Sequence, residues 1–289
     1  MRLAALILIL TGVLCAEEYV FRSTAQGDLK IHVFLPPDWK AGDKRPGILF
    51  FFGGGFTNGS PDQFFSKAEY LAKRGMVAAS AEYRIMSKHG TLPDAAVEDC
   101  REAMKWMRSK AAQLGLDPKR LAASGGSAGG TCAAATAYGP DLAARPDALV
   151  LYNPSMESSK ERVLARKEGL KASEVDRLYD MLSPAHHVKK GDAPSVQFFG
   201  TEDTLLVGAK KFVARSATVG NRAELFTAKG QKHGFFNDRK GQTAWHLATL
   251  AETDRFLVSL GWLKGTGTIV APEGTVLVKE RVEAGEATN

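Results

Sequence analysis

Apolar and polar residues follow two repeating patterns along most of this chain. Short and almost continuously apolar runs, such as Ile48–Phe52 and Ala148–Tyr152, have the length expected of buried strands. Between such runs lie longer segments with apolar residues at helical spacing, such as Pro93–Lys110. Strands that are apolar throughout and alternate with helices indicate a mostly parallel sheet with helices on both faces. The pattern therefore predicts an α/β fold.

The remaining segments extend the same alternation from end to end. The predicted strands are Tyr19–Ser23, Leu29–Leu35, Ile48–Phe52, Met76–Ser80, Leu121–Ser124, Ala148–Tyr152, Ser195–Phe199 and Ala223–Ala228. The predicted helices lie near Pro61–Arg74, Pro93–Lys110, Gly130–Tyr138 and Ala244–Leu260.

One segment, Asn153–Leu182, interrupts the alternation. It is charged and contains helix-like stretches at Ser159–Lys167 and Ala172–Leu182. We favour an inserted cap that lies over a binding site and shapes its pocket. A plain surface excursion is the alternative.

The amino terminus has the composition of a targeting segment. Arg2 precedes an apolar run over residues 3–10, and mostly small residues follow up to Ala16. This order predicts a secretory signal peptide over residues 1–16, and therefore a secreted or periplasmic protein. The apolar run is too short for a stable membrane span. Lipid anchoring through Cys15 is less favoured, because a large leucine precedes it where such processing requires a small residue.

Length and composition fit one folded unit. With 289 residues, of which 44% are hydrophobic, the chain can bury the core of a single domain. We place this domain at residues 17–264, with the cap at about 153–182 and a C-terminal tail over residues 265–289. The tail is rich in Gly, Thr, Val and Glu, and it either adds an edge strand at Thr275–Lys279 or stays loose.

The formal net charge of +6 does not indicate a nucleic-acid partner. The basic residues are spread along the chain, and the densest pairs are Lys189-Lys190 and Lys210-Lys211. Neither an arginine-rich arm nor a base-stacking module is present in the sequence. A solvated basic surface is therefore predicted.

The sequence predicts neither a metal nor a cofactor. Metal-binding spacings such as C-x-x-C or H-E-x-x-H are missing from it. The neighbouring His186 and His187 are expected to pack, because adjacent side chains rarely point to one centre. Gly125–Gly130 lacks the lysine of a phosphate-binding loop. Cys100 and Cys132 are expected to be buried thiols, with a disulfide between them as the alternative.

The segment with the clearest chemistry is Gly125-Gly126-Ser127-Ala128-Gly129. It lies between a predicted strand and a predicted helix. A serine at a sharp strand-to-helix corner projects its hydroxyl out of the fold, and the flanking glycines allow the backbone to make that corner. The helix that follows directs free N–H groups toward any oxyanion that forms there. Ser127 is therefore the candidate nucleophile.

An acid and a base follow in the order that such a serine requires. Asp203 comes after the predicted strand Ser195–Phe199. His233 comes after the predicted strand Ala223–Ala228 and is flanked by glycines, which allow its loop to turn toward Ser127. A serine needs an imidazole to take its proton, and the imidazole needs a carboxylate on its other nitrogen. Serine, acid and histidine in this chain order are typical of a nucleophile-elbow hydrolase.

These two assignments have competitors in the sequence. Glu202 is the rival of Asp203, and we favour the aspartate. The other histidines have less suitable positions, in an early strand, a loop, an adjacent pair and the last helix; they are His32, His89, His186, His187 and His246.

A glycine loop supplies the fourth part of the site. The strand Ile48–Phe52 runs directly into three glycines at residues 53–55. Their backbone N–H groups are free to turn toward a bound carbonyl oxygen. We expect Gly54 and Gly55, together with the N–H of Ala128, to form an oxyanion hole.

Several ordered motifs resemble the α/β-hydrolase esterases related to hormone-sensitive lipase, across roughly residues 36–263. They are Phe52-Gly53-Gly54-Gly55-Phe56, Ala81-Glu82-Tyr83-Arg84, Leu92-Pro93-Asp94-Ala95-Ala96-Val97-Glu98-Asp99, Leu114-Gly115-Leu116-Asp117-Pro118-Lys119-Arg120, the Ser127 segment, and the Asp203 and His233 segments. The resemblance implies an α/β-hydrolase fold and hydrolysis of carboxylic esters through an acyl-serine, without metal or cofactor.

The chain departs from that family at two places. The family's glycine loop commonly begins with a histidine that holds the loop through polar contacts, and Phe52 stands there in this chain. The second departure follows Tyr83-Arg84, where many relatives carry a longer acidic and proline-bearing continuation. This second departure affects the expected geometry of the floor of the substrate pocket, and not the reaction.

We therefore expect an exported serine carboxylesterase that acts on short acyl esters, for instance acetyl groups on a small molecule or a polysaccharide. Two alternatives remain open from the sequence. One is a small peptidase of the prolyl-oligopeptidase type, although such enzymes usually carry a bulky aromatic residue where Ala128 follows the serine. The other is a binding protein with a decayed hydrolase site.

Overall fold

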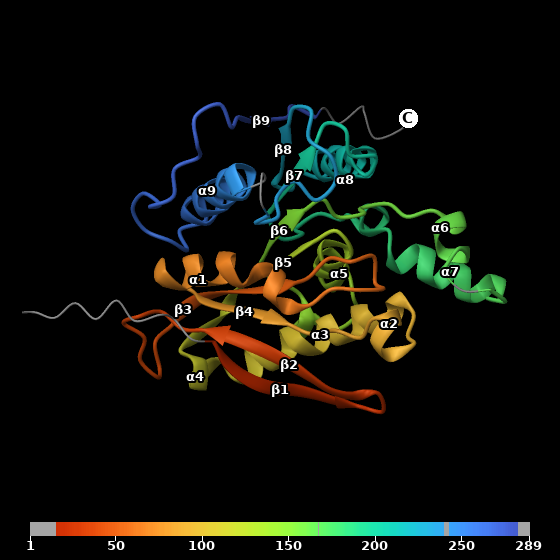
Figure 1. Ribbon diagram of the computed structural model, residues 1–289, viewed down its shortest axis with the longest axis horizontal. Coiled ribbons are helices and arrows are strands. Elements are labelled where there is room, and N and C mark those ends of the chain that lie inside the picture. Colours follow the sequence, from red (N-terminus) through yellow and green to blue (C-terminus); the bar gives the residue numbers. More distant parts are fainter. Residues whose placement is uncertain (1–15, 167, 240–242, 283–289) are drawn as a thin grey trace, which may run out of the picture.

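The computed structural model describes residues 16–166, 168–239 and 243–282 (Figure 1). Within these ranges the strands form one nine-stranded sheet in the order β1-β2-β4-β3-β5-β6-β7-β8-β9. The predicted signal peptide lies almost wholly outside the described residues, of which Ala16 is the first.

The centre of the sheet is parallel and its edges are antiparallel. The strands β4, β3, β5, β6, β7 and β8 pair in parallel, whereas β1, β2 and β9 join through antiparallel pairings. The strands are β1 (Glu17–Thr24), β2 (Gly27–Phe34), β3 (Arg45–Phe51), β4 (Val77–Ala81), β5 (Leu116–Gly126), β6 (Ala148–Tyr152), β7 (Ser195–Gly200), β8 (Ala223–Ala228) and β9 (Leu277–Lys279). The predicted α/β class with a mostly parallel sheet is confirmed.

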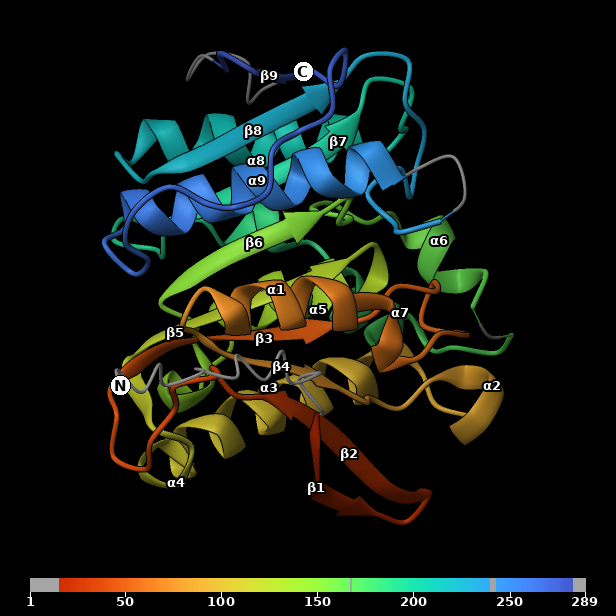
Figure 2. The same ribbon diagram turned by 60° about the vertical axis from the view of Figure 1, so that its left-hand side comes forward.

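Helices cover both faces of the sheet, so the core has two layers. Leu49 and Phe51 of β3 pack into one layer, whose buried residues include those of α3 (Pro93–Ser109) and α5 (Ala128–Ala137). Ile48 and Phe50 point the other way, into the layer formed with α1 (Phe65–Lys73) and α9 (Thr243–Ser259). Figure 2 shows α1 and α9 in front of the sheet, with α5 and α8 behind it. A central strand buried on both faces explains its continuous apolar sequence.

The other helices are mostly short. They are α2 (Met86–His89), α4 (Ala111–Leu114), α6 (Lys160–Leu164), α7 (Ala172–Met181) and α8 (Leu206–Thr218), and the 3-10 helices η1 (Pro61–Phe64), η2 (Leu142–Ala144) and η3 (Pro184–His187). Of these, α8 is a full-length helix that the sequence pattern did not predict. The predicted helix near residues 61–74 is divided into η1 and α1.

The insertion predicted after β6 forms α6 and α7, which lie beyond the ends of the central strands (Figure 1). Arg162 of α6, and Ser158, Arg166 and Leu182 beside the two helices, line the same pocket as Ser127, so this segment borders the candidate site. In the tail, β9 pairs with β8 in antiparallel register, with Leu277 opposite Ala228. The tail therefore adds an edge strand, which is shorter than the predicted residues 275–279.

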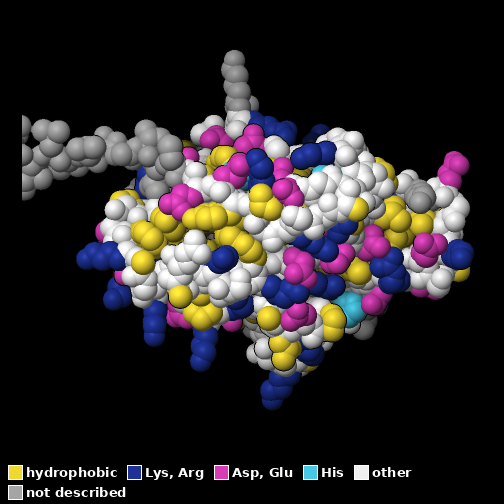
Figure 3. All heavy atoms as spheres, turned by 90° about the horizontal axis from the view of Figure 1, so that it is seen from below, with side chains coloured by type: hydrophobic (Ala, Val, Ile, Leu, Met, Phe, Trp, Pro, Cys, Tyr) yellow, Lys and Arg dark blue, Asp and Glu magenta, His cyan; other side chains and the backbone are white. Residues whose placement is uncertain are grey.

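The described surface carries mixed charge. Figure 3 shows Lys and Arg side chains distributed over one face, with Asp and Glu side chains among them. Among the residues that the structure describes, no helix has the length and apolar character needed to cross a membrane.

A buried carboxylate fastens the β1–β2 hairpin and the chain after β4 to α3. Asp99, whose side chain is 0% exposed, accepts hydrogen bonds from Arg22 Nη1 at 2.6 Å, Arg84 Nε at 2.9 Å and the Arg84 backbone N–H at 2.9 Å. Its neighbour Glu98 contacts the same two arginines, but its side chain is 57% exposed. Removing the buried carboxylate leaves the two partly buried guanidinium groups with only the exposed Glu98 as an acidic partner.

We expect Asp99→Ala to lower the free energy of unfolding by about 3–5 kcal/mol, because one member of a buried charge cluster is lost. Glu98→Ala is the matched control and should cost at most about 1 kcal/mol, since exposed ion pairs contribute little. Urea denaturation followed by tryptophan fluorescence measures both. Equal losses in the two variants would contradict the assigned role of Asp99.

Candidate active site

Ser127 occupies a tight corner between β5 and α5. Its backbone has φ 51° and ψ −119°, a conformation that residues other than glycine rarely adopt. Glycine is required on both sides of it. A Cβ on Gly125 would approach the Phe51 carbonyl oxygen to 2.6 Å, and one on Gly129 would overlap the carbonyl oxygens of Phe51 and Phe52. The corner therefore holds the start of α5 directly against the end of β3.

The structure brings Ser127, His233 and Asp203 into one line of hydrogen bonds. His233 Nε2 lies 2.8 Å from Ser127 Oγ, and His233 Nδ1 lies 2.8 Å from Asp203 Oδ2. The three residues follow β5, β8 and β7, whose carboxyl ends meet at one edge of the sheet. In this arrangement Asp203 orients the imidazole, and the free Nε2 can accept the serine proton.

The carboxylate of Asp203 is fixed on all sides. Its side chain is 1% exposed, and Oδ1 accepts a hydrogen bond from the Leu205 N–H at 2.9 Å. Oδ2 also accepts one from Asn153 Nδ2 at 2.7 Å. The rival Glu202 is exposed and makes no side-chain hydrogen bond to His233.

The other histidines are engaged elsewhere. His89 Nδ1 accepts the Ile85 N–H, His186 contacts Glu157, and buried His246 contacts Lys67. His187 Nε2 lies 3.0 Å from the Asp180 carbonyl oxygen, and His32 lies on β2. No group of three or more His, Cys, Asp and Glu side chains among the described residues is arranged to hold a metal ion. Cys100 and Cys132 are both buried and unbridged, as the favoured interpretation expected.

Backbone strain is concentrated around this site. Within the described residues, the non-glycine residues with positive φ are Phe56 (64°), Ser127 (51°) and Asn153 (47°). Phe56 follows the glycine loop, and Asn153 follows β6 and contacts Asp203. Each such conformation costs roughly 1–3 kcal/mol and persists only where the surrounding structure enforces it.

The three glycines of the loop do not act alike. The Gly53 N–H donates to Gln63 Oε1 at 2.6 Å and is therefore occupied. Gly55 and Ala128 line the same pocket as Ser127, and Gly54 lies between Gly53 and Gly55 with φ 127°. Ala128 is the first residue of α5, so its N–H has no acceptor within the helix. These positions are compatible with an oxyanion hole formed by Gly54, Gly55 and Ala128.

Aromatic packing holds the start of the glycine loop at Phe52. The Phe52 ring stacks on Tyr83 with centroids 4.1 Å apart, and Tyr83 Oη donates to the Phe52 carbonyl oxygen at 2.6 Å. Burial raises the pKa of Tyr83 well above its ordinary value, so the hydroxyl keeps the proton that it donates. The backbone at Phe52 is thus fixed without a polar side chain there.

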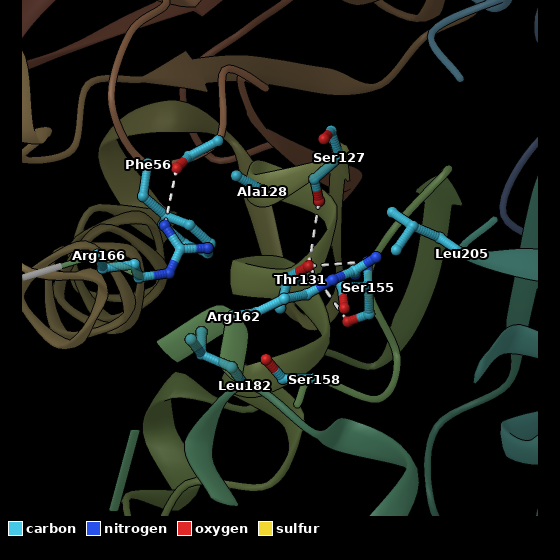
Figure 4. A pocket seen from close by; sticks show the side chains of 11 residues that line it. Phe56, Ser127, Ala128, Thr131, Ser155, Ser158, Arg162, Arg166, Leu182 and Leu205 are labelled. Carbon is cyan, nitrogen blue, oxygen red and sulfur yellow. Dashed lines mark hydrogen bonds between the residues drawn. The ribbon is translucent and has the colours of Figure 1, made fainter. Parts of the chain in front are cut away.

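A small pocket of about 120 Å³ lies against Ser127 (Figure 4). It is much smaller than the roughly 300–1,000 Å³ of pockets that enclose drug-sized ligands. The cap contributes Arg166, whose Nη1 donates to the Gly55 carbonyl oxygen at 2.9 Å and whose guanidinium lies over the Phe56 ring. The remaining lining combines hydroxyl, basic and leucine side chains, from Thr131, Ser155, Ser158, Arg162, Leu182 and Leu205.

A second recess of about 380 Å³ lies on the side of His233 and is more open to solvent. It is lined by Arg162, Glu202, Asp203, Thr204, Leu205, Lys232 and His233. Arg162 and Leu205 border both spaces. An ester carbonyl at Ser127 therefore has a narrow space on one side and a wider one on the other.

Sequence reasoning missed the amide side chains that support this site, namely Gln63, Asn153 and Asn237, and also the cap residue Arg166. A signal existed for Asn153, since polar residues at the carboxyl ends of parallel strands lie at the usual site of chemistry in α/β folds. Gln63 and Asn237 lie in no motif. Their sequence separation of 174 residues leaves their contact visible only in the structure.

Comparisons with known proteins agree with this geometry. The profile of a family with the alpha/beta hydrolase fold matches residues 48–237. Carboxylesterase NlhH of Mycobacterium tuberculosis is 26% identical over 236 residues, which cover 73% of this chain and 72% of that protein. Esterase LipU of the same species is 26% identical, over 66% of this chain and 70% of its own length.

Solved structures are more similar. The propionate-bound structure of Est2, a thermophilic esterase from the Planctomycetes species Thermogutta terrifontis, is 38% identical with a TM-score of 0.79. That match covers 87% of this chain and 97% of the other. The butyrate-bound form matches equally well, over 86% and 96% of the two chains. Another structure shows the same esterase phosphorylated by paraoxon, with a TM-score of 0.78 and 38% identity over 87% and 96% of the chains.

We expect Ser127→Ala to lower kcat for a nitrophenyl acetate by roughly 10⁴-fold or more, because the nucleophile is lost while the pocket remains. Ser158→Ala is the matched control, since this hydroxyl lines the same pocket and should change kcat only slightly. Steady-state kinetics give both values, and circular dichroism checks the fold. An active Ser127→Ala protein, or an inactive but folded Ser158→Ala protein, would place the nucleophile elsewhere.

Proposed function

This chain belongs to the α/β-hydrolase family and is a carboxylesterase, and we propose that it is exported and cleaves esters of short acyl groups with Ser127 as its nucleophile. The observation that carries the proposal is the small pocket beside a serine that is already hydrogen-bonded to His233.

The geometry supports the following reaction sequence. His233 Nε2 takes the proton of Ser127 as Oγ attacks the ester carbonyl carbon, and Asp203 stabilises the imidazolium that forms. The carbonyl oxygen becomes an oxyanion that the N–H groups of Gly54, Gly55 and Ala128 stabilise. His233 then gives its proton to the alcohol oxygen as the carbon–oxygen bond breaks, which leaves an acyl-serine.

Deacylation repeats the same transfers with water. His233 removes a proton from a water molecule as its oxygen attacks the acyl-serine carbonyl, and then returns a proton to Ser127 Oγ as the acid leaves. The step needs only water and the groups already present.

The two spaces beside Ser127 fit the two halves of an ester. The alcohol oxygen must reach His233 to be protonated, so the alcohol lies in the open recess on that side. The acyl group then lies in the pocket of about 120 Å³, where hydroxyl and basic side chains leave little room for a long chain. The related Est2 structures contain propionate and butyrate, which are short acids.

The open recess has space for a bulky alcohol. A sugar hydroxyl is a suitable leaving group there, because the recess offers charged and hydroxyl-bearing side chains such as Glu202, Lys232 and Thr204. Acetyl groups on a polysaccharide meet both requirements. They combine a short acyl group with a large polar alcohol.

Export is supported by the sequence of the leader alone. N-terminal sequencing of protein recovered outside the cytoplasm should read Glu17 first. Recovery only from the cytoplasm, with the leader retained, would contradict export.

We expect kcat/KM for nitrophenyl esters to be highest for acetyl to butyryl and to fall at least tenfold for octanoyl, because the acyl pocket is too small for the longer chain. Each excluded methylene forfeits roughly 0.8 kcal/mol of burial. Acetate release from acetylated xylan, measured in parallel, tests the polysaccharide. Preference for octanoyl would contradict the short-acyl assignment, and activity on nitrophenyl acetate without acetate release from xylan would restrict the substrate to small esters.

A further inference from the structure

Two amide side chains, Gln63 and Asn237, connect the oxyanion loop to the loop that carries the catalytic base. The Gly53 N–H donates to Gln63 Oε1 at 2.6 Å, and Gln63 Nε2 donates to Asn237 Oδ1 at 2.7 Å. Asn237 Nδ2 then donates to the Gly234 carbonyl oxygen at 2.7 Å, next to His233. The two loops follow β3 and β8, which have β5, β6 and β7 between them in the sheet.

The same chain of bonds continues to the carboxylate. The Gly234 N–H donates to Asn153 Oδ1 at 3.3 Å, and Asn153 Nδ2 donates to Asp203 Oδ2 at 2.7 Å. Asp203 Oδ2 also accepts from His233, which contacts Ser127. The loop at the carboxyl end of every strand from β3 through β8 in the sheet order therefore contributes at least one group to a single connected set.

The backbone groups at the two ends of this chain of hydrogen bonds determine the orientation of the amide groups of Gln63 and Asn237. At one end Gln63 faces a backbone donor, the Gly53 N–H, so its oxygen must point there and its nitrogen toward Asn237. At the other end Asn237 faces a backbone acceptor, the Gly234 carbonyl, so its nitrogen must point there. The only pairing that remains is nitrogen of Gln63 to oxygen of Asn237, which is the bond observed.

Burial makes this arrangement costly to break. Asn153 is fully buried, Asn237 is 7% exposed and Gln63 is half-buried. A buried amide that loses its partner is left with an unsatisfied polar group, because water cannot reach it to replace the bond. Phe52, at the start of the glycine loop, has no polar side chain that could hold the loop by hydrogen bonds.

We propose that Gln63 and Asn237 are positioning residues that hold the oxyanion loop in register with His233. This inference rests on the esterase mechanism above. The Gly53 N–H is consumed by Gln63, and this contact fixes the peptide that precedes the donors Gly54 and Gly55. Asn237 fixes the turn that carries His233. The bond between the two amides sets the distance between the group that stabilises the oxyanion and the group that moves the proton.

The test uses the full chain and acetyl, propionyl and butyryl nitrophenyl esters. We expect Gln63→Leu to lower kcat by roughly 10- to 100-fold, since small displacements of a preorganised site cost this much, while KM changes little. A trifluoromethyl ketone, which forms an oxyanion on Ser127, should lose affinity by the same factor as kcat/KM falls.

Two further variants separate positioning from folding. Gln63→Glu keeps the acceptor for the Gly53 N–H but cannot donate to Asn237, so it should lose activity although the contact with Gly53 is kept. The effects of Gln63→Leu and Asn237→Leu should be strongly non-additive in the double variant, because both break the same connection. Asn58→Ala is the matched control, an amide in the same loop whose exposed side chain lies outside the connected set.

The outcomes are distinct. A folded Gln63→Leu protein with wild-type kcat and ketone affinity would overturn the positioning role and leave the proposed function standing. A folded Gln63→Glu protein with wild-type kcat would also overturn it, even where Gln63→Leu fails to fold. Additive losses in the double variant would show two separate structural effects and would likewise overturn it. A wild-type protein that hydrolyses none of the three esters would overturn the proposed function together with this inference.

Discussion

The backbone corner at Ser127 is the constraint on which the rest of this structure depends. The chain leaves β5 and enters α5 through a residue at φ 51°, and the glycines on either side allow the helix to start against the end of β3. This close approach places the nucleophile, the first free N–H of α5 and the glycine loop within one small volume. A side chain at position 125 or 129 would push β3 and α5 apart. The nucleophile, the N–H at the start of α5 and the glycine loop would then no longer lie together.

Parallel strand order supplies the remaining groups. Because β3, β5, β6, β7 and β8 are consecutive neighbours in a parallel arrangement, the loops after them emerge at one edge. Asp203 and His233 come from two of these loops, Asn153 from a third, and the cap after β6 closes the pocket above them. Strain at Phe56, Ser127 and Asn153 is tolerated because the hydrogen bonds that join the loops enforce those conformations.

The sequence predicted the parts of the site that a local pattern encodes. Buried strands are continuous apolar runs, and the residues that follow them are the ones that meet at the sheet edge. Ser127, Asp203 and His233 could therefore be selected from the sequence, which also predicted the sheet and most of the helices. The helix α8 was not, because its apolar residues are interspersed with Lys210-Lys211 and with Gly208, a poor helix former. The direction of the Gly53 N–H and the contact between Gln63 and Asn237 depend on loops that are distant in sequence. No local pattern records such contacts.

The central claim is that Ser127, activated by His233, forms the covalent acyl intermediate. Treatment with paraoxon followed by peptide mass mapping tests it most directly. The account predicts one phosphoryl adduct, located on Ser127 in the folded protein, and much slower labelling in His233→Ala. An adduct on a different residue, or hydrolysis of esters by folded protein that never acquires the label, would contradict it.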